Sequence, residues 1–253
     1  MIIKKTATSD VPHLKRLWKE AFGDTDEFID GFFSLGFSPD RSLALYCEDE
    51  IASVIYWFDC EFKNKKVAYV YGVATRKCER GKGYSTLLMK RAHEILYEDG
   101  YVGVILVPAD EGLFRFYERI GYLNCCLIDE KLHTASADTQ SITKISAKEY
   151  LKLRNPLLPQ DSIVFTNNNL HFLDFTAFFY KGNGFILATS SDNDTLKIIE
   201  FWGDEKLIPS ITAALNHKSA TTRTYGKSRP FAMYFSFDKN TSDLPNYLGF
   251  AFD

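Results

Sequence analysis

The chain has 253 residues, of which 45% are hydrophobic and 25% are charged, and its formal net charge is −3. This length suits one large domain or two small ones, and the charge, spread evenly over both halves, excludes a protein that tracks a nucleic-acid backbone. No stretch approaches the roughly 20 apolar residues that a membrane span needs, and the N-terminus lacks the apolar run of a signal peptide. We therefore expect a cytoplasmic protein that engages neither nucleic acid nor membrane.

The five cysteines all lie in the first half of the chain and show neither zinc-ligand nor redox spacing. We expect them to be reduced and mostly buried, which favours the cytoplasm. The five histidines are scattered, with no pair at i and i+4, so the sequence predicts no metal site.

The first 130 residues mix strand and helix patterns. A short strand at 2–6 precedes a helix that Ser9 or Asp10 can cap, and this helix carries Pro12 in its first turn and runs to about Ala21. The elements that follow are a helix at 26–35, strands at 41–47, 51–62 and 66–75, a helix from 80–86 to Gly100, a strand at 101–107, a helix at 111–120 and a strand at 122–129. Hairpins followed by a βαβ crossover predict a mixed α/β (α+β) domain with a partly antiparallel sheet.

The stretch from Arg80 to Thr86 follows a strand and opens a long helix. The first amides of a helix have no intrahelical acceptor and the macrodipole makes that end positive, so a phosphate can be held there. Gly81 and Gly83 let a ligand approach the backbone, and Arg80 and Lys82 add positive charge. The pattern predicts a diphosphate cradle, and a turn with two glycines and exposed charges is the alternative. The spacing fits neither the nucleotide-binding loop nor the dinucleotide fingerprint.

Residues 80–85 resemble the acyl-CoA pyrophosphate motif of the GNAT superfamily, Arg-x-x-Gly-x-Gly/Ala, with Ser85 in place of the last small residue. Residues 113–122 resemble the second signature of that family, a Phe-Tyr followed four residues later by Gly-Tyr or Gly-Phe. The resemblance covers about residues 1–130. It implies an N-acetyltransferase that takes acetyl-CoA as donor, needs no metal, and acylates an amine on a small molecule or peptide.

In that family acyl-CoA binds where two parallel strands splay apart, which places the site between strands 66–75 and 101–107 here. Gly72 lies inside the first of these strands, where a glycine often marks a bulge or a close backbone approach. The pantetheine arm pairs with the end of that strand and the diphosphate lies on the loop. By resemblance the cofactor-binding residues are Val73, Ala74, Thr75, Arg80, Gly81, Lys82, Gly83, Tyr84, Ser85 and Thr86.

The resemblance also implies direct transfer from the thioester to a neutral amine. Tyr117 matches the family tyrosine that often protonates the departing thiolate, and the alternative is that it only packs its helix against the sheet. The family's acceptor site borders residues 22–33, which mix aromatic and acidic side chains. Carboxylates there would attract a cationic amine, whereas an ordinary amphipathic helix with a solvated acidic face explains them equally well.

The second half shows no second loop of this kind. A linker-like stretch at 134–141 precedes residues 142–147, which lead into a helix as residues 3–7 do. Only an acidic turn at 203–205 follows the strand near 195–202, and it would repel a diphosphate. We predict a catalytic GNAT domain at 1–135 and a degenerate GNAT-like domain at 136–253, with an unrelated α+β domain as the alternative.

This pairing resembles the enhanced-intracellular-survival-type acetyltransferases without their third, sterol-carrier-like domain. In those enzymes the terminal carboxylate reaches the active site, so Asp253 becomes a candidate general base, anchored by Phe250 and Phe252. The alternative is that this C-terminal segment forms the final strand of the second domain. Two other functions remain open at this point: a non-catalytic acyl-CoA sensor, and a protein that binds nucleotide phosphates.

Overall fold

The computed structural model describes residues 1–166, 169–190, 195–238, 243–249 and 251, and it divides into two compact units. The first unit is Met1–Leu123 with Met233–Asp243, and the second is Asn124–Ala232 with Leu244–Asp253. The domain limits 1–135 and 136–253 stay a prediction. They differ from this division because residues 124–135 belong to the second unit and residues 233–243 belong to the first.

The first unit opens with β1 (Ile2–Lys5), α1 (Val11–Phe22) and α2 (Asp26–Gly31). Pro12 stands in the first turn of α1, where its missing N–H costs no hydrogen bond, and Gly23 ends the helix at φ 77°. One turn of π-helix, Phe32–Gly36, continues α2 and buries Phe32 and Phe33. The helix predicted at 26–35 therefore forms, with a change of winding in its second half.

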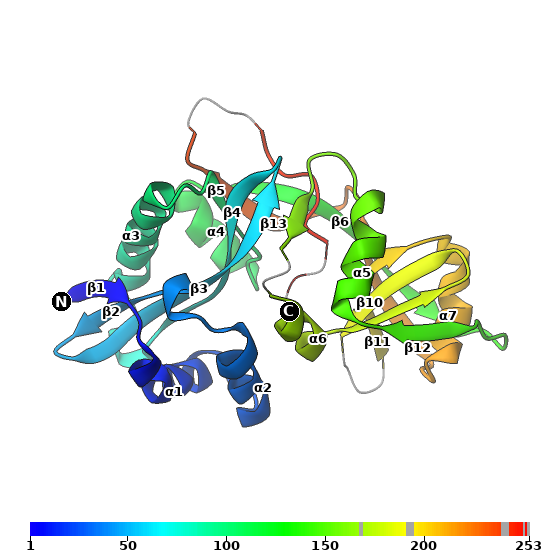
Figure 1. Cartoon of the computed structure of the whole chain (residues 1–253), viewed down its shortest axis with the longest axis horizontal. Coiled ribbons are helices and arrows are strands. Elements are labelled where there is room, and N and C mark those ends of the chain that lie inside the picture. The colour runs from blue at the N-terminus through cyan, green and yellow to red at the C-terminus, as the bar shows by residue number, and fades with distance from the viewer. Residues whose placement is uncertain (167–168, 191–194, 239–242, 250, 252–253) are drawn as a thin grey trace. The chain divides into compact units, whose positions relative to one another are not determined.

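The sheet of the first unit has the order β1-β2-β3-β4-β5-β13. Its remaining strands are β2 (Ser42–Cys47), β3 (Glu50–Phe62), β4 (Lys65–Thr75), β5 (Gly103–Leu106) and β13 (Arg229–Ser236). All neighbours pair antiparallel except β4 and β5, which are parallel. Helices α1 and α2 lie on one face, and α3 (Tyr84–Glu98) and α4 (Glu111–Arg119) lie on the other (Figure 1).

Strand alternation gives each face of this sheet its own core. On the face of α3 and α4, Leu43, Ile55 and Val70 pack with Leu88 and Leu96. The opposite face is aromatic, and Trp18 of α1 lies there within 4.3–6.5 Å, centroid to centroid, of the rings of Phe22, Phe28, Phe32, Phe33, Tyr56 and Tyr71. Part of the large phenylalanine and tyrosine content thus fills the layer between this face of the sheet and helices α1 and α2.

Strands β4 and β5 separate at the place that the sequence predicts. They pair from Val67↔Gly103 to Val70↔Leu106, and β4 then continues alone on that side to Thr75. The register of β3 against β4 shifts between Ile55 and Tyr56, so Gly72 is the extra residue of a bulge. At φ 72°, its missing Cβ leaves room for Trp18 and Tyr56, each of which would lie 3.4 Å from it.

The last strand of the first unit comes from the far end of the chain. Met233–Ser236 of β13 pairs antiparallel with Leu106–Gly103 of β5. Conversely, β6 (Leu123–Thr134), which follows α4 directly, pairs with β12 and belongs from Asn124 onward to the second unit. The two halves of the sequence have therefore exchanged their final strands.

The second unit repeats the strand order of the first, as β7-β9-β10-β11-β12-β6. Its elements are β7 (Ile142–Ile145), α5 (Ala147–Arg154), β8 (Ile163–Phe165), α6 (Leu170–Thr176), β9 (Phe178–Gly182), β10 (Phe185–Ser190), β11 (Thr195–Trp202), α7 (Ile208–Ala214) and β12 (Ser219–Tyr225). Strands β11 and β12 are parallel, as β4 and β5 are. The predicted repetition of the fold in the second half is confirmed.

Two differences make the second unit a reduced copy. Helix α7 has seven residues where α3 has fifteen, and the chain passes from β12 to β13 without a counterpart of α4. The carboxylate of Asp204 already accepts a hydrogen bond from the amide of Lys206 at 3.0 Å. This acidic turn lies between β11 and α7, where the first unit has its glycine-containing loop between β4 and α3. No helix within the described parts of the chain is long and apolar enough to cross a membrane.

Candidate active site

A cavity of about 260 Å³ lies where β4 runs on beyond the end of β5. It is lined by Ala21, Phe22, Val73, Ala74, Thr75, Glu79, Arg80, Gly81, Gly83, Tyr84, Ser85, Leu113, Phe116 and Tyr117. Helix α1, strand β4, the start of α3 and helix α4 all contribute. The structure thus brings together eight of the ten predicted cofactor-binding residues and Tyr117, while Lys82 and Thr86 are not among the lining residues.

The start of α3 offers free backbone donors to this cavity. Gly83 is the N-cap at φ 77°, no side chain caps the helix, and the first helical hydrogen bond joins the amide of Leu87 to the carbonyl of Gly83. A Cβ at Gly81 or Gly83 would meet no heavy atom within 4 Å, so the backbone is open on this side. An anion that reaches the loop can therefore accept hydrogen bonds from first-turn amides and is favoured by the helix dipole.

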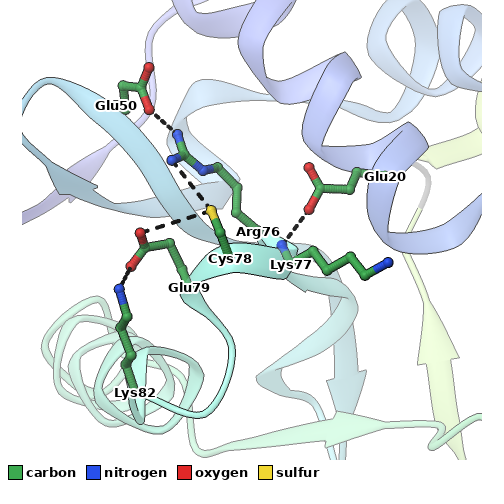
Figure 2. Close-up of polar contacts among 7 residues, drawn as sticks. All are labelled: Glu20, Glu50, Arg76, Lys77, Cys78, Glu79 and Lys82. Atoms are coloured by element: carbon green, nitrogen blue, oxygen red, sulfur yellow. Dashed lines mark hydrogen bonds and ion pairs between the residues drawn. The ribbon is translucent and has the colours of Figure 1, made fainter.

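The loop cations differ in how they are engaged. Arg80 donates through Nε to the carbonyl of Thr75 at 3.1 Å, and no ion pair involving it occurs within the described residues. Lys82 points instead to Glu79, with Nζ 2.8 Å from Oε2 (Figure 2). Arg76 pairs with the carboxylate of Glu50. Arg80 is thus the loop cation that lines the cavity without a carboxylate partner.

The end of β4 forms one wall of the cavity. Val73, Ala74 and Thr75 pair with β3 on one side, and Ser53 reinforces this edge by donating from Oγ to the carbonyl of Ala74 at 2.9 Å. On the other side β5 has already ended at Leu106. Backbone groups of β4 on that side are in place to pair with an extended ligand, as strand edges commonly do.

Tyr117 is buried, with 7% of its surface exposed, and burial raises the pKa of its phenol to about 12. Its ring packs edge-on against Phe116 and Tyr122, with centroids 5.1 Å and 5.5 Å away. Its hydroxyl makes no hydrogen bond with any residue that the structure describes, and the side chain lines the cavity. Tyr117 is therefore a protonated donor, without a hydrogen-bond partner in the described parts of the chain, that lines the same cavity as Val73–Thr75.

Four lining residues were not predicted from the sequence. Leu113 and Phe116 share one face of α4 with Tyr117, a spacing of i, i+3 and i+4 that could have revealed them. Ala21 belongs to α1, and no local pattern links it to the loop. Glu79 directly precedes Arg80, and a carboxylate is not expected beside a diphosphate.

The acidic residues near α2 are largely engaged within the two first helices. Asp24 accepts a hydrogen bond from Nε1 of Trp18 at 2.7 Å, and Asp26 and Asp30 form ion pairs with Lys19 at 2.9 Å and Lys15 at 2.6 Å. These contacts favour the reading of an ordinary polar helix face over that of an amine-attracting patch.

Asp253, the predicted base, lies outside the described residues, as do Phe250 and Phe252. Among the residues that are described, no group of three or more His, Cys, Asp or Glu side chains could hold a metal ion.

Comparison with known proteins fits this geometry. No curated protein sequence matches the chain. Its fold is similar to a GCN5-related N-acetyltransferase from Kribbella flavida, with 14% identity and a TM-score of 0.69 over 94% of this chain and 71% of that one. It is also similar to a putative acetyltransferase from Pyrococcus horikoshii, with 13% identity and a TM-score of 0.67 over 99% and 94%.

Eis1 from Mycobacterium abscessus has the same fold, with 10% identity and a TM-score of 0.66 over 94% of this chain and 74% of that one. Residues 2–124 match the family described as the acetyltransferase (GNAT) domain, and this stretch contains the whole lining of the cavity. The stretch with the bulged β4, splayed β5 and open start of α3 thus matches the GNAT acetyltransferase domain, and the fold of the chain is that of GNAT acetyltransferases.

Proposed function

We propose that the protein is an N-acetyltransferase that moves an acetyl group from acetyl-CoA directly to an amine on a small molecule or peptide. The observation that carries this proposal is the juxtaposition of Tyr117 with the free edge of β4 and the uncapped start of α3 in one cavity. The family match supports acyl transfer as the reaction class, and the donor and acceptor are part of the proposal.

The donor would span the cavity in three parts. The diphosphate would accept hydrogen bonds from the amides of residues 83–86 and an ionic contact from Arg80. The pantetheine arm would pair with the backbone of Val73–Thr75, and one amide there would stabilise the oxyanion that forms on the thioester carbonyl. Loss of such a donor typically raises a reaction barrier by about 3–4 kcal/mol.

The leaving group would be the CoA thiolate, and Tyr117 would donate the hydrogen bond and the proton that it needs. The C–N bond forms as the amine attacks, the C–S bond breaks as the tetrahedral intermediate collapses, and the sulfur takes the phenolic proton. The nitrogen loses one proton to a base or to water, and an equivalent proton from water restores the phenol of Tyr117. A buried thiol also has a raised pKa, because burial disfavours its charged form as it does that of the phenol. Burial therefore raises the pKa of both the phenol that gives the proton and the thiol that receives it.

The proposal predicts that the purified protein releases a free thiol from acetyl-CoA when it is given a panel of primary amines. The release of free thiol and the mass that the amine gains with one acetyl group would be measured together. As control, Gly83→Glu should lose CoA binding, because its carboxylate would meet the diphosphate. The variant should still fold, since the space around Gly83 is open, but it should lose about 1–2 kcal/mol of stability because φ is 77° there.

The outcomes separate the competing functions. CoA binding without turnover over a wide amine panel would support the acyl-CoA sensor instead of the enzyme. Protection against heat unfolding by ATP but not by CoA would support a nucleotide-phosphate site and contradict the proposal.

We further propose Asp253 as the general base that deprotonates the incoming amine. The segment that precedes it is fixed in the second unit: Tyr247 donates to Oε1 of Glu200 at 2.7 Å, and Arg154 donates through Nη2 to the carbonyl of Leu248 at 3.0 Å. Arg154 and Glu200 are themselves fully buried and joined at 2.8 Å. A buried ion pair of this kind adds little net stability but specifies the position of what it binds.

This second proposal predicts that deletion of Asp253, and separately a few glycines appended after Asp253, lower kcat by about 100-fold, the lower range for a general base. The thermal midpoint should stay unchanged, because the anchoring contacts at Tyr247 and Leu248 remain. Wild-type kcat in both variants would eliminate the tail as the base.

A further inference from the structure

Glu79 stands at the boundary between two cavities. It ends the short turn Lys77–Glu79 that precedes the loop, and it lines the cofactor cavity described above. It also lines a second, polar cavity of about 610 Å³, to which Arg76, Lys82, Glu48 and Glu50 contribute. Its side chain is only 16% exposed, so its charge acts on its neighbours with less solvent screening than a free surface carboxylate.

Figure 2 shows how this carboxylate is engaged. Its Oε2 accepts from Nζ of Lys82 at 2.8 Å, and its Oε1 lies 4.0 Å from Sγ of Cys78, which in turn lies 3.7 Å from Nη2 of Arg76. Arg76 is already paired with Glu50. The carboxylate therefore holds Lys82, a cation of the diphosphate motif, away from the lining of the cavity in which the diphosphate would bind.

We propose that Glu79 is an affinity-determining residue that competes with the diphosphate of CoA for Lys82. This inference rests on the proposed function, because it takes the loop 80–86 as the CoA site. An incoming diphosphate gains Arg80 and the helix amides at once, but it can gain Lys82 only by sharing its ammonium with Glu79 or by breaking that pair. It also meets the negative charge of Glu79, which lines the same cavity.

The consequence for function is that CoA binds less tightly than the loop would otherwise allow. CoA is part of the donor and is also the product that leaves last. Weaker binding of its diphosphate therefore shortens the time for which CoA stays bound after the reaction. Affinity differences among closely related complexes are expressed mostly in the dissociation rate. Glu79 would then keep the exchange of CoA for acetyl-CoA fast.

The first test is Glu79→Gln, measured by calorimetric titration with CoA. We expect binding to tighten by about tenfold, because the variant removes a nearby like charge and frees Lys82. Glu50→Gln is the matched control, since it makes the same chemical change at a carboxylate that does not line the cofactor cavity, and we expect it to alter affinity by less than about twofold. Unchanged or weaker CoA binding in Glu79→Gln would overturn the proposal.

A double-mutant cycle distinguishes competition from a structural role of Glu79. In the wild type, Lys82→Ala should weaken CoA binding by less than about twofold, because Lys82 is held by Glu79. In the Glu79→Gln background, Lys82→Ala should weaken CoA binding by about tenfold. The CoA affinity of Glu79→Gln should also fall more steeply with salt concentration than that of the wild type. Equal effects of Lys82→Ala in both backgrounds would contradict competition.

Arg80→Ala separates this proposal from the proposed function. It should weaken CoA binding whether or not Glu79 is present. If Arg80→Ala has no effect, the CoA site itself is misplaced and both proposals fall. If Arg80→Ala weakens binding but Glu79→Gln does not tighten it, only the role of Glu79 is wrong.

Discussion

Residues 1–135 expressed alone are expected not to form a stable domain, although they contain the whole lining of the cofactor cavity. The reason is β13, whose residues Met233–Ser236 complete the sheet of the first unit beside β5. Met233 is 1% exposed and belongs to the core that includes Leu88 and Leu106. Without this strand, β5 becomes an open edge and its apolar neighbours meet water.

The magnitude of this loss is large compared with the stability of an ordinary domain. Each backbone hydrogen bond lost with β13 costs about 0.5–1.5 kcal/mol, and each core side chain exposed, such as Met233, costs about 1.5–3 kcal/mol more. The total free energy of unfolding of a domain is only about 5–15 kcal/mol. We therefore expect fragment 1–135 to aggregate or to lack a cooperative thermal transition by circular dichroism.

The control restores the missing strand without the second unit. Residues 229–243 joined to the fragment through a flexible linker of about 15 residues should recover a cooperative transition and CoA binding, because the linker lets the strand reach its place beside β5. A fragment 1–135 that unfolds cooperatively and binds CoA without this segment would show that β13 is dispensable.

The exchange of strands marks the limit of what the sequence could reveal about the fold. The order from β1 to β5 follows from local pattern, because each strand lies beside the next one along the chain, including the parallel pair β4 and β5 that a helical crossover joins. The pairing of β13 with β5 could not be predicted, since period-two patterning records burial and carries no information on which strands pair. The short β8, α6 and β9 were missed, because each has only three to seven residues and little room for a period.

The site divides in the same way. Residues 80–86 could be predicted because their function depends on consecutive backbone amides and glycines, which a local motif records. The contribution of Ala21 and Phe22 depends on how α1 crosses β4, which no short window encodes. The pairing of Lys82 with Glu79 was visible as an i, i+3 spacing, but the motif directed attention to the lysine as a diphosphate ligand.

The mutation Tyr117→Phe is expected to lower kcat by about 100-fold with little change in CoA affinity, since general acids contribute roughly 10²–10⁴-fold. The hydroxyl would act only on the departing thiolate, which does not exist in the ground-state complex, so binding should be insensitive to its loss. Single-turnover measurements at saturating acetyl-CoA would report the chemical step.

Tyr122→Phe is the matched control. It removes a phenolic hydroxyl from the ring that packs against Tyr117, but this hydroxyl is hydrogen-bonded to Nε2 of His93 at 2.7 Å and Tyr122 does not line the cavity. We expect this variant to lose about 1–2 kcal/mol of unfolding free energy, because the His93 nitrogen keeps its burial and loses its partner. Its kcat should change by less than about threefold, since the hydroxyl is not placed to reach the thiolate.

Stability and catalysis are thus predicted to separate between the two tyrosines. Tyr117 has no hydrogen-bond partner among the described residues, so Tyr117→Phe should unfold at the wild-type temperature. Burial raises the pKa of Tyr117 to about 12, so the phenol stays protonated at lower pH and loses its proton as the pH rises through that value. The kcat profile of the wild type should therefore show no decline from this group between about pH 7 and 10. A twofold or smaller effect of Tyr117→Phe on the chemical step would leave Tyr117 a packing residue and require another donor for the thiolate.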